Sequence, residues 1–449
     1  MRKLLLIFTL FLGITPLFSE EPISFAEVEQ LTMQHYYASQ WDSVIIVGMK
    51  GIEAGHDYFY LRVRLGMAYF YQSNFAKAIQ HLEKARKFNS SDEFTNSYLY
   101  LSYKYMGRLA DAEMMGRKLS DTLRTLDLFK KPKFFSGLYT EIGYSPSTNY
   151  SPTPLSRQSP YFEETSTKNN AMSYGFVGLT NQATPWMTLF YGVTSLGTTL
   201  TKYTYENLPP LPQKLKTTTT DLSIKTLQFY INARVRVARG WIVSPYYHAI
   251  SMRGSEGAAS KPKKNDTTSF ISNDAIMGFG LEKYYHNFVF SGELSNNRFN
   301  NKTHLQAQTG VTWFPFSNQN LYLNGAVTYN MAQGVDSLFP PNYEKNKLYV
   351  TGKIGGKLFS KLWGETTIYG GNIQDSQIGN GYLFFSNPSS YTMMANATLT
   401  LYLKKLKISL KYQFAGLNGT KLSYITTNPI TSEFSFNQQT ITGGLLWNF

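Results

Sequence analysis

The residue types that most often perform chemistry are few in this sequence and do not cluster. There are six histidines and no cysteine, so thiol nucleophiles, disulfides and thiolate-bound metals are excluded. No two histidines have the spacing of a metal-binding pair, and no phosphate-binding glycine loop stands out. The histidines are His35, His56, His81, His248, His286 and His304. We therefore predict no catalytic residue, no cofactor and no bound metal, and an enzyme is the least favoured alternative.

Charged side chains at every second position offer a different kind of chemistry. Over 227–237, apolar residues alternate with polar ones, and Arg234 and Arg236 fall on the polar face. Alternate residues of a strand point to opposite sides of a sheet, so these two cations lie about 7 Å apart along one face. The same alternation predicts eight residues that line the inside of a barrel. They are Arg234, Arg236, Glu293, Lys353, Lys357, Glu365, Lys407 and Lys411.

The balance of these inward charges leaves two interpretations open. Basic residues outnumber acidic ones, and a water-filled lumen of this kind would favour anionic solutes or sugars. Alternatively, carboxylates such as Glu293 and Glu365 pair with the cations, and the network plugs a narrow barrel. Alternation does not distinguish the two interpretations, because it fixes the face of a residue and not its partner.

Only a closed sheet would place these residues inside. The region 134–449 divides into fourteen segments of alternating polarity, and most of the connections alternate between short and long. Bacterial outer-membrane barrels have even strand numbers, with short turns in the periplasm and long loops outside. We predict a transmembrane antiparallel β-barrel of about 14 strands, with 12 or 16 as alternatives. The expected strands are 135–144, 171–181, 186–202, 224–238, 241–252, 270–285, 287–297, 303–314, 320–332, 346–358, 361–373, 390–403, 405–416 and 437–449, and the expected long loops are 145–170, 204–223, 253–269, 333–345, 374–389 and 417–436.

The last segment, 437–449, indicates how such a barrel would be assembled. It alternates between apolar and polar positions and stops on an aromatic residue. A polar residue is followed two positions later by glycine, then by hydrophobic residues at the third and fifth places. These residues are Thr442, Gly444, Trp447 and Phe449. The ending resembles the C-terminal signal of bacterial outer-membrane β-barrels, which implies the barrel-assembly machinery and outer-membrane lipid as partners.

The segment from about residue 24 to residue 126 repeats with a period of 34 residues. Leu31, Leu65 and Leu99 form one series, and a second series of tyrosines contains Tyr71. We expect Tyr71 and Ala78 to lie between helices. The middle copy has the residues that pack the helices of a tetratricopeptide repeat (TPR), namely Leu65, Gly66, Tyr69, Ala78, Leu82 and Ala85. The segment resembles a TPR array, which implies a helical solenoid that binds a protein partner or serves as a spacer.

The ends and the joints of these regions divide the chain. Residues 1–19 have the charged start, the short apolar core and the small residue before an acidic pair that are typical of a secretory signal peptide. We expect the helical repeats over 20–126, a linker over 127–133 that contains Pro132, and the barrel over 134–449. The net charge of +14 is dispersed rather than concentrated in one run, so we predict no nucleic-acid partner.

The predicted fold class is α + β multidomain, a short TPR α-solenoid followed by a transmembrane barrel. The whole chain resembles the TPR-plus-barrel proteins of the outer membrane, such as the export porins for exopolysaccharides. That resemblance implies a pore or export channel in the outer membrane, with the TPR domain in the periplasm docking a protein partner or guiding a solute. An anionic solute or a polysaccharide is the expected cargo. The alternative is a non-conducting anchor that presents the TPR domain as a scaffold.

Overall fold

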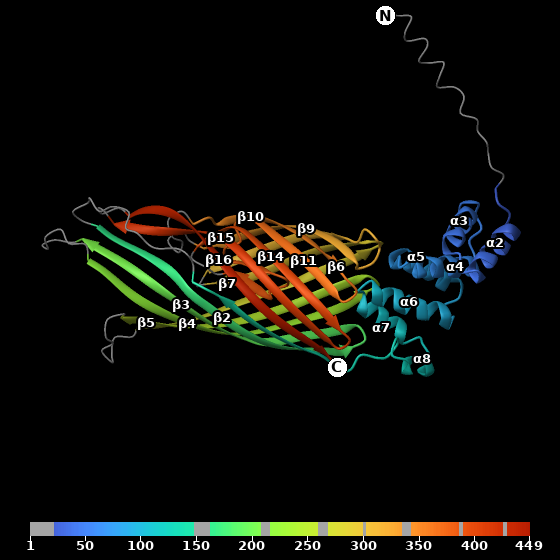
Figure 1. The fold of residues 1–449 in the computed structure, drawn as a ribbon, viewed down its shortest axis with the longest axis horizontal. Coiled ribbons are helices and arrows are strands. Elements are labelled where there is room, and N and C mark those ends of the chain that lie inside the picture. Colours follow the sequence, from blue (N-terminus) through green and yellow to red (C-terminus); the bar gives the residue numbers. More distant parts are fainter. Residues whose placement is uncertain are drawn as a thin grey trace, which may run out of the picture.

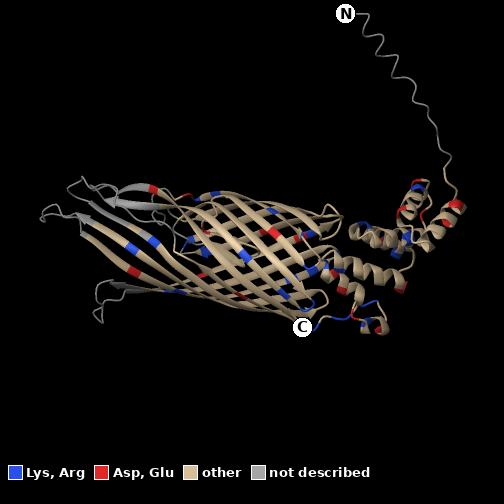
Figure 2. Cartoon of the chain, in the orientation of Figure 1, with Lys and Arg blue, Asp and Glu red and all other residues tan. Residues whose placement is uncertain are grey.

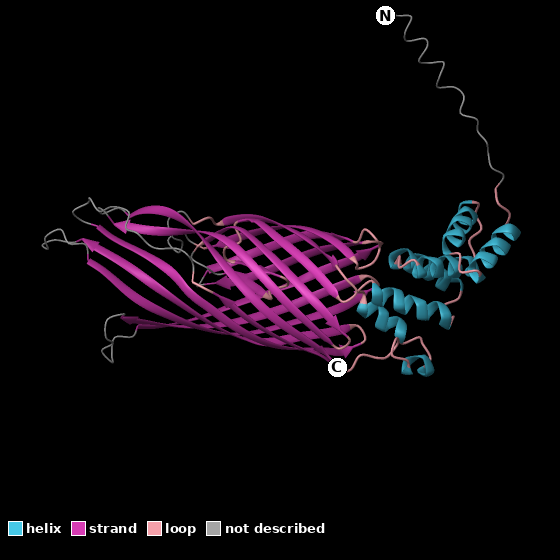
Figure 3. Cartoon of the chain, in the orientation of Figure 1, coloured by secondary structure: helices cyan, strands magenta, loops and turns pink. Residues whose placement is uncertain are grey.

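The computed structural model describes residues 22–147, 162–207, 216–258, 268–299, 302–334, 343–385, 389–424 and 429–449. The predicted signal peptide, 1–19, lies outside the described residues, as do parts of the predicted long loops. A set of helices occupies one end of the molecule, and a closed β-barrel forms the rest (Figure 1). The helices sit beside the short turns of the barrel, at the same end as the C-terminus (Figure 3).

The described residues before the barrel form seven helices, six of which are arranged in three pairs. The first helices of the pairs begin 34 residues apart, and so do the second helices, which confirms the predicted repeat. Side chains of Ser24, Asn74, Asp92 and Ser120 accept the first free amides of four of these helices. The helices are α2 (Phe25–Tyr37), α3 (Trp41–Glu53), α4 (Phe59–Tyr71), α5 (Phe75–Phe88), α6 (Glu93–Tyr105), α7 (Leu109–Gly116) and α8 (Asp121–Thr125).

Close packing of small against large residues holds the helix pairs together. A Cβ atom added at Gly66 would lie 2.5 Å from the Leu82 side chain, so α4 and α5 touch only because residue 66 has no side chain. The other predicted packing positions are buried, namely Leu65, Tyr69, Ala78, Leu82 and Ala85. Tyr71 is half exposed, but its ring stacks on Trp41 of α3 with 4.6 Å between centroids.

The barrel is closed by fourteen antiparallel strands, which confirms the predicted strand number. Each strand pairs with its neighbour in sequence, apart from a small hairpin, and the last strand pairs with the first. The strands are β1 (Phe135–Ser145), β2 (Phe162–Thr184), β3 (Met187–Asn207), β4 (Lys216–Ala238), β5 (Trp241–Ala258), β6 (Thr268–Tyr285), β7 (Phe288–Phe299), β8 (Lys302–Trp313), β9 (Leu321–Gln333), β10 (Asn346–Lys357), β11 (Leu362–Gly371), β14 (Ser390–Leu403), β15 (Leu406–Tyr424) and β16 (Pro429–Asn448).

Several strands are longer than the sequence predicts. β2 and β4 have 23 residues each, whereas β11 on the other side of the barrel has 10. Parts of the predicted loops 145–170, 204–223 and 417–436 are therefore strand. The start of β4 reads Lys-Thr-Thr-Thr-Thr, which polarity alone assigns to a loop, but β-branched threonine favours an extended backbone.

The two faces of the barrel wall differ in chemistry. Leu227 and Phe229 of β4 are exposed on the outside, whereas Gln228 and Tyr230, which alternate with them, are buried inside. Figure 2 shows the charged residues of the wall as isolated positions rather than a continuous patch. Among the described helices, none is both long and apolar enough to cross a membrane.

Candidate functional site: a luminal plug and the chamber beneath it

The segment 372–385, which we call the plug, folds into the interior of the barrel. It contains a two-stranded hairpin of β12 (Ser376–Ile378) and β13 (Leu383–Phe385). The prediction that 374–389 is an outer loop is therefore wrong for its described part, 374–385. The tip of the hairpin, 379–381, has positive φ angles at all three residues, which Gly379 and Gly381 adopt without strain.

Gln377 is the most connected residue of the plug and is fully buried. Its amide nitrogen donates to Tyr246 Oη at 3.0 Å, to Ser295 Oγ at 3.3 Å and to Glu293 Oε1. Its amide oxygen accepts from the main-chain nitrogen of Gly381 at 2.7 Å. One side chain thus ties the hairpin tip to β5 and β7.

Wall side chains also hold the main chain of the plug. Gln306 of β8 donates to the carbonyl of Gln377 at 2.8 Å and accepts from its main-chain N–H at 3.0 Å. The side-chain amide of Gln306 thus makes the same pair of hydrogen bonds to residue 377 that a neighbouring strand would make. His248 Nδ1 contacts the carbonyl of Gly381 at 2.7 Å, and Tyr230 donates to the carbonyl of Asn380 at 2.9 Å.

The open end of the hairpin is anchored to a third sector of the wall. Asn330 of β9 donates to the carbonyl of Asp375 at 2.7 Å and to Ser376 Oγ at 2.8 Å. Lys347 of β10 donates to the carbonyl of Gln374 at 3.1 Å and lies 3.6 Å from the Asp375 carboxylate. The plug therefore has polar anchors on β4, β5, β7, β8, β9 and β10.

Two apolar clusters flank the plug. On one side, Tyr382 and Phe384 pack against a cluster of wall residues that includes Tyr230, Ile276 and Phe299. On the other side, Ile373, Ile378 and Phe385 of the plug pack against a second set of wall residues. That set consists of Tyr349, Tyr369, Tyr391, Met394, Ala415 and Leu417. The plug has its own small core on each face, and the lumen is filled at this level.

A third boundary of the plug is polar and incompletely hydrogen-bonded. Within the described residues, neither side-chain polar atom of Asn297 and neither ring nitrogen of His304 has a hydrogen-bond partner. The two residues are cross-strand neighbours on β7 and β8, and both are fully buried. Thr328 Oγ1 and Asn330 Oδ1 on β9 also lack partners. Asn330 nevertheless holds the plug through its amide nitrogen, as described above.

A chamber of about 590 Å³ lies between the plug and the short-turn end of the barrel. Ile378, Gly379 and Asn380 of the plug bound it on one side, and Phe314 and Gln319 of a short turn bound it on the other. Its volume falls in the range of about 300–1,000 Å³ that is usual for small-molecule sites. Its remaining lining mixes hydroxyl and amide groups with the rings of Tyr284, Tyr322, Tyr349, Trp363, Tyr369 and Tyr402.

Four of the eight predicted luminal charges, Arg234, Arg236, Lys353 and Glu365, form ion pairs with an opposite charge. Arg234 lies 2.8 Å from Glu282, and Lys353 lies 3.2 Å from Glu365. Arg236 pairs at 2.5 Å with Asp111. Of the two carboxylates that the alternative interpretation named, Glu365 pairs with Lys353, and neither pairs with Arg234 or Arg236. Glu282 faces Arg234 across the strands, and the partner of Arg236 comes from the helices, which no strand pattern could indicate.

The remaining predicted residues have other places. Lys407 lies over the Tyr402 ring at 4.8 Å, and Lys411 follows it on the same strand face of β15. Lys357 shares a face of β10 with Lys353. Of the assembly-signal residues, Thr442 is buried inside, and Gly444 pairs with Glu141 of β1. Trp447 and Phe449 are half exposed.

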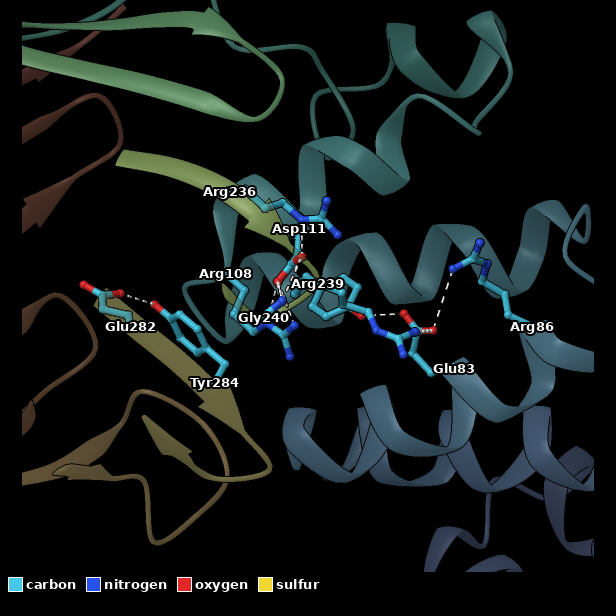
Figure 4. A network of polar contacts seen from close by, with 10 residues as sticks. Glu83, Arg86, Arg108, Asp111, Arg236, Arg239, Gly240, Glu282 and Tyr284 are labelled. Carbon is cyan, nitrogen blue, oxygen red and sulfur yellow. Dashed lines mark hydrogen bonds and ion pairs between the residues drawn. The ribbon is translucent and has the colours of Figure 1, made fainter. Parts of the chain in front are cut away.

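The helices rest on three consecutive short turns of the barrel, and Figure 4 shows the polar contacts around the first of them, at Arg239 and Gly240. Asp111 of α7 accepts from Arg236 and from the main-chain nitrogen of Gly240, the latter at 3.2 Å. Glu83 of α5 accepts from Arg239 of the same turn. Arg108 lies over the ring of Tyr284 at 5.4 Å, next to the following turn.

The third turn forms hydrogen bonds with the main chain of α5 and of the residues before it. Ala76 N donates to the Ser317 carbonyl at 3.2 Å, and Asn318 Nδ2 donates to the Ser73 carbonyl at 3.0 Å. Phe314 of this turn belongs to the hydrophobic core of the last two helix pairs. We call these contacts with the three turns the cap interface.

No protein-family model and no curated protein matches this chain. Among solved structures, a TodX mutant described as a monoaromatic hydrocarbon channel is 8% identical over 70% of this chain and 91% of its own, with a TM-score of 0.44. A Pseudomonas aeruginosa FadL homologue is 8% identical over 70% and 90%, with a TM-score of 0.42. A MamA mutant is 23% identical over 22% of this chain and 73% of its own, with a TM-score of 0.21. The architecture of a helical-repeat domain joined to a closed barrel rests on the strand pairing and helix spacing described above.

Proposed function

We propose that this protein is a gated transport channel of the outer membrane. The observation that carries the proposal is the plug. Barrels of about eight strands are filled by their own side chains, whereas wider barrels leave an interior that is open to water or occupied by another segment. Here the plug occupies it, and hydrogen bonds and small apolar clusters hold the plug to the wall without strand pairing. A segment held in this way can move aside without unfolding the wall.

The membrane location follows from the outer face of the barrel. Large apolar side chains are exposed on that face, including Leu227, Val350, Ile368 and Leu410. A water-facing sheet with this surface would aggregate, whereas lipid covers it, and the closed barrel leaves no unpaired edge. By the usual relation between turn length and side, the helices and the short turns face the periplasm.

The charge and the lining of the chamber determine which solutes we expect to pass. Arg234 and Lys353 are compensated by Glu282 and Glu365, so the chamber has less free positive charge than the sequence alone implied. Its lining of hydroxyl groups, amides and aromatic rings suits small polar solutes, and strong anion selectivity is not required. The helical domain serves as the docking site for a periplasmic protein partner.

Removal of the plug tests this proposal. We would replace residues 375–385 with a short Gly-Ser linker in a chain that also carries Asp111→Ala and Glu83→Ala, which release the helices from the short turns, and measure ion current in planar bilayers. The same double variant with the plug in place is the control. We expect a low conductance for the control and a large, steady conductance for the plug deletion. Heat-modifiable migration in detergent gels would show that both barrels are folded. A folded, plug-deleted barrel that passes no current would instead support the non-conducting anchor.

A further inference from the structure

The helices contribute to a second closure of the lumen, at the end opposite to the hairpin's outer anchors. The side chains of Tyr284, Phe314 and Tyr322 line the chamber and also pack against the core of the last helix pairs. Gly107, between α6 and α7, approaches so closely that a Cβ atom there would overlap the Gln319 side chain. The residues that bound the chamber on this side are therefore the residues on which the helices rest.

The charges of the cap interface have partners on both sides. Asp111 is 3% exposed and contacts Arg236 of the barrel, but it also accepts from Arg108 of its own domain at 2.7 Å. Glu83 contacts Arg239 of the barrel, and it also accepts from Tyr103 at 2.5 Å.

Undocking would therefore leave neither carboxylate without a partner. Breaking a buried ion pair is costly chiefly when one charge stays buried and uncompensated. Here Asp111 keeps Arg108, and Glu83 keeps Tyr103 and has Arg86 at 3.7 Å. Arg236 and Arg239 would become hydrated at the rim of the barrel. Both the docked and the undocked arrangement are thus electrostatically satisfied.

We propose that the helical domain is a detachable cap over the short-turn mouth of the barrel, held by the contacts of Asp111 and Glu83 with Arg236 and Arg239. This inference rests on the proposed channel, because it assigns a gate to the same lumen. When the cap is docked, it covers the mouth at Tyr284, Phe314 and Tyr322 and narrows the path from the chamber to the periplasm. A ligand or protein that draws the carboxylates away from the turn at Arg239 and Gly240 opens it.

Accessibility of the chamber tests the cap directly. The chain has no cysteine, so Ser291→Cys, on the chamber wall, provides a single reactive thiol. We would measure its rate of modification by a membrane-impermeant maleimide in the full-length protein. We expect slow modification with the interface intact and at least ten-fold faster modification when Asp111→Ala and Glu83→Ala are added. Glu29→Gln is the matched control, since it removes an ion pair with Arg64 at 2.8 Å inside the helical domain.

A second pair of variants removes the same bonds from the barrel side. Arg236→Gln with Arg239→Gln leaves the helices unchanged and should accelerate modification in the same way. In a separate Ala76→Cys and Ser317→Cys protein, which carries no chamber thiol, an oxidised disulfide should hold the cap in place. Installed in the plug-deleted barrel, that disulfide should reduce the current at least ten-fold, and a reductant should restore it.

The outcomes separate the cap from the channel. Equal modification rates in the protein with an intact cap interface and in both double variants would overturn the cap, whatever the conductance. A plug-deleted barrel without current would overturn the channel, while the thiol rates would still report on the cap. A current that is unaffected by the disulfide would also overturn the cap.

Discussion

The helical domain and the barrel fill their interiors in opposite ways. The helical core consists of apolar residues that fit by size, such as Leu82 against Gly66. The barrel interior is filled by a separate segment, which Gln377 and wall residues on six strands hold through hydrogen bonds. The first kind of interior repeats along the chain and encloses a few polar side chains, such as Arg62 and His81. The second is assembled once, from residues that are far apart in the sequence.

The largest expected effect comes from removing the central residue of the plug. In Gln377→Ala, Glu293 and Ser295 lose a donor, and the Gly381 N–H loses its acceptor. A buried group without a partner costs about 1–3 kcal/mol, so the hairpin tip should leave the wall. We expect fast hydrogen exchange over 375–385 and frequent channel openings. Protection equal to that of the wild type would show that the apolar clusters alone hold the plug.

A matched control for that variant is Gln438→Ala. Gln438 also donates from its amide, at 3.2 Å to Ser145 Oγ, but it contacts the barrel wall and not the plug. Its replacement should leave the exchange over 375–385 and the current unchanged.

The next prediction concerns the pH dependence of the stability of the helical domain, which contains the buried residue His81. Burial, together with the nearby cations Arg62 and Lys84, lowers the pKa of His81 from 6.5 to about 4. Between these pH values the unfolded state binds a proton that the folded state does not. The free energy of unfolding should therefore fall as the pH decreases from 6.5 towards 4, by up to about 3 kcal/mol at 1.36 kcal/mol per pH unit. Helical circular dichroism during denaturation of residues 20–130, which we expect to fold alone, would measure it.

Glu29 and Asp57 limit the pH range in which His81 alone should change the free energy of unfolding. Hydrogen bonds from Arg64 and Arg62 lower the pKa values of Glu29 and Asp57, respectively. Their stabilisation is present above the unfolded pKa and is lost as the pH falls below it, so they act mainly below about pH 4.5. His81→Phe should flatten the profile above that pH. An unchanged profile in His81→Phe would mean that another group titrates there.

A smaller effect tests the fit of the helices by size. Gly66→Ala places a Cβ atom 2.5 Å from the Leu82 side chain, so the helices must move apart or Leu82 must change rotamer. We expect a loss of about 1–3 kcal/mol in the free energy of unfolding. With Leu82→Ala in a double-mutant cycle, the combined loss should be smaller than the sum of the two single losses. Additive losses would show that the two residues do not press on each other.

The smallest expected effect is an increase in the stability of the closed plug. Asn297→Leu removes two buried polar atoms that have no hydrogen-bond partner among the described residues. Replacement of such groups by an apolar side chain is often neutral or stabilising, so we expect a change of about 1 kcal/mol or less in favour of the closed plug. Slower exchange over 375–385 would report it, with the outward-facing Asn296→Leu as the control. Faster exchange would show that Asn297 binds water that secures the plug.

These differences explain what the sequence could predict. The 34-residue spacing identified the helix pairs, because every pair buries the same apolar pattern. Alternation identified fourteen strands and the inward face of Arg234 and Lys353, because the side-chain period of a strand is two. Neither rule names a partner across the lumen, so Glu282 and Asp111 were missed.

The plug was missed for a related reason. Its polar residues resemble those of an outer loop, and its wall anchors come from strands that are distant in sequence. One signal was available, since Gly379-Asn380-Gly381 between apolar residues is typical of a tight hairpin. That signal predicts the hairpin, but the side of the barrel on which it folds depends on groups such as Gln306 and Asn330.

The pairing of β1 with β16 has a consequence for how the molecule folds. Ser145 donates to the carbonyl of Gln439, 294 residues later in the chain, so the barrel closes only when its last strand is present. Contacts between residues so far apart form slowly, whereas the helical repeats need only near neighbours in sequence. The helical domain should therefore reach its native state while the strands are still open. An exported chain would then carry a folded domain ahead of an unfolded one, and the exposed strands would need chaperones until the seam forms.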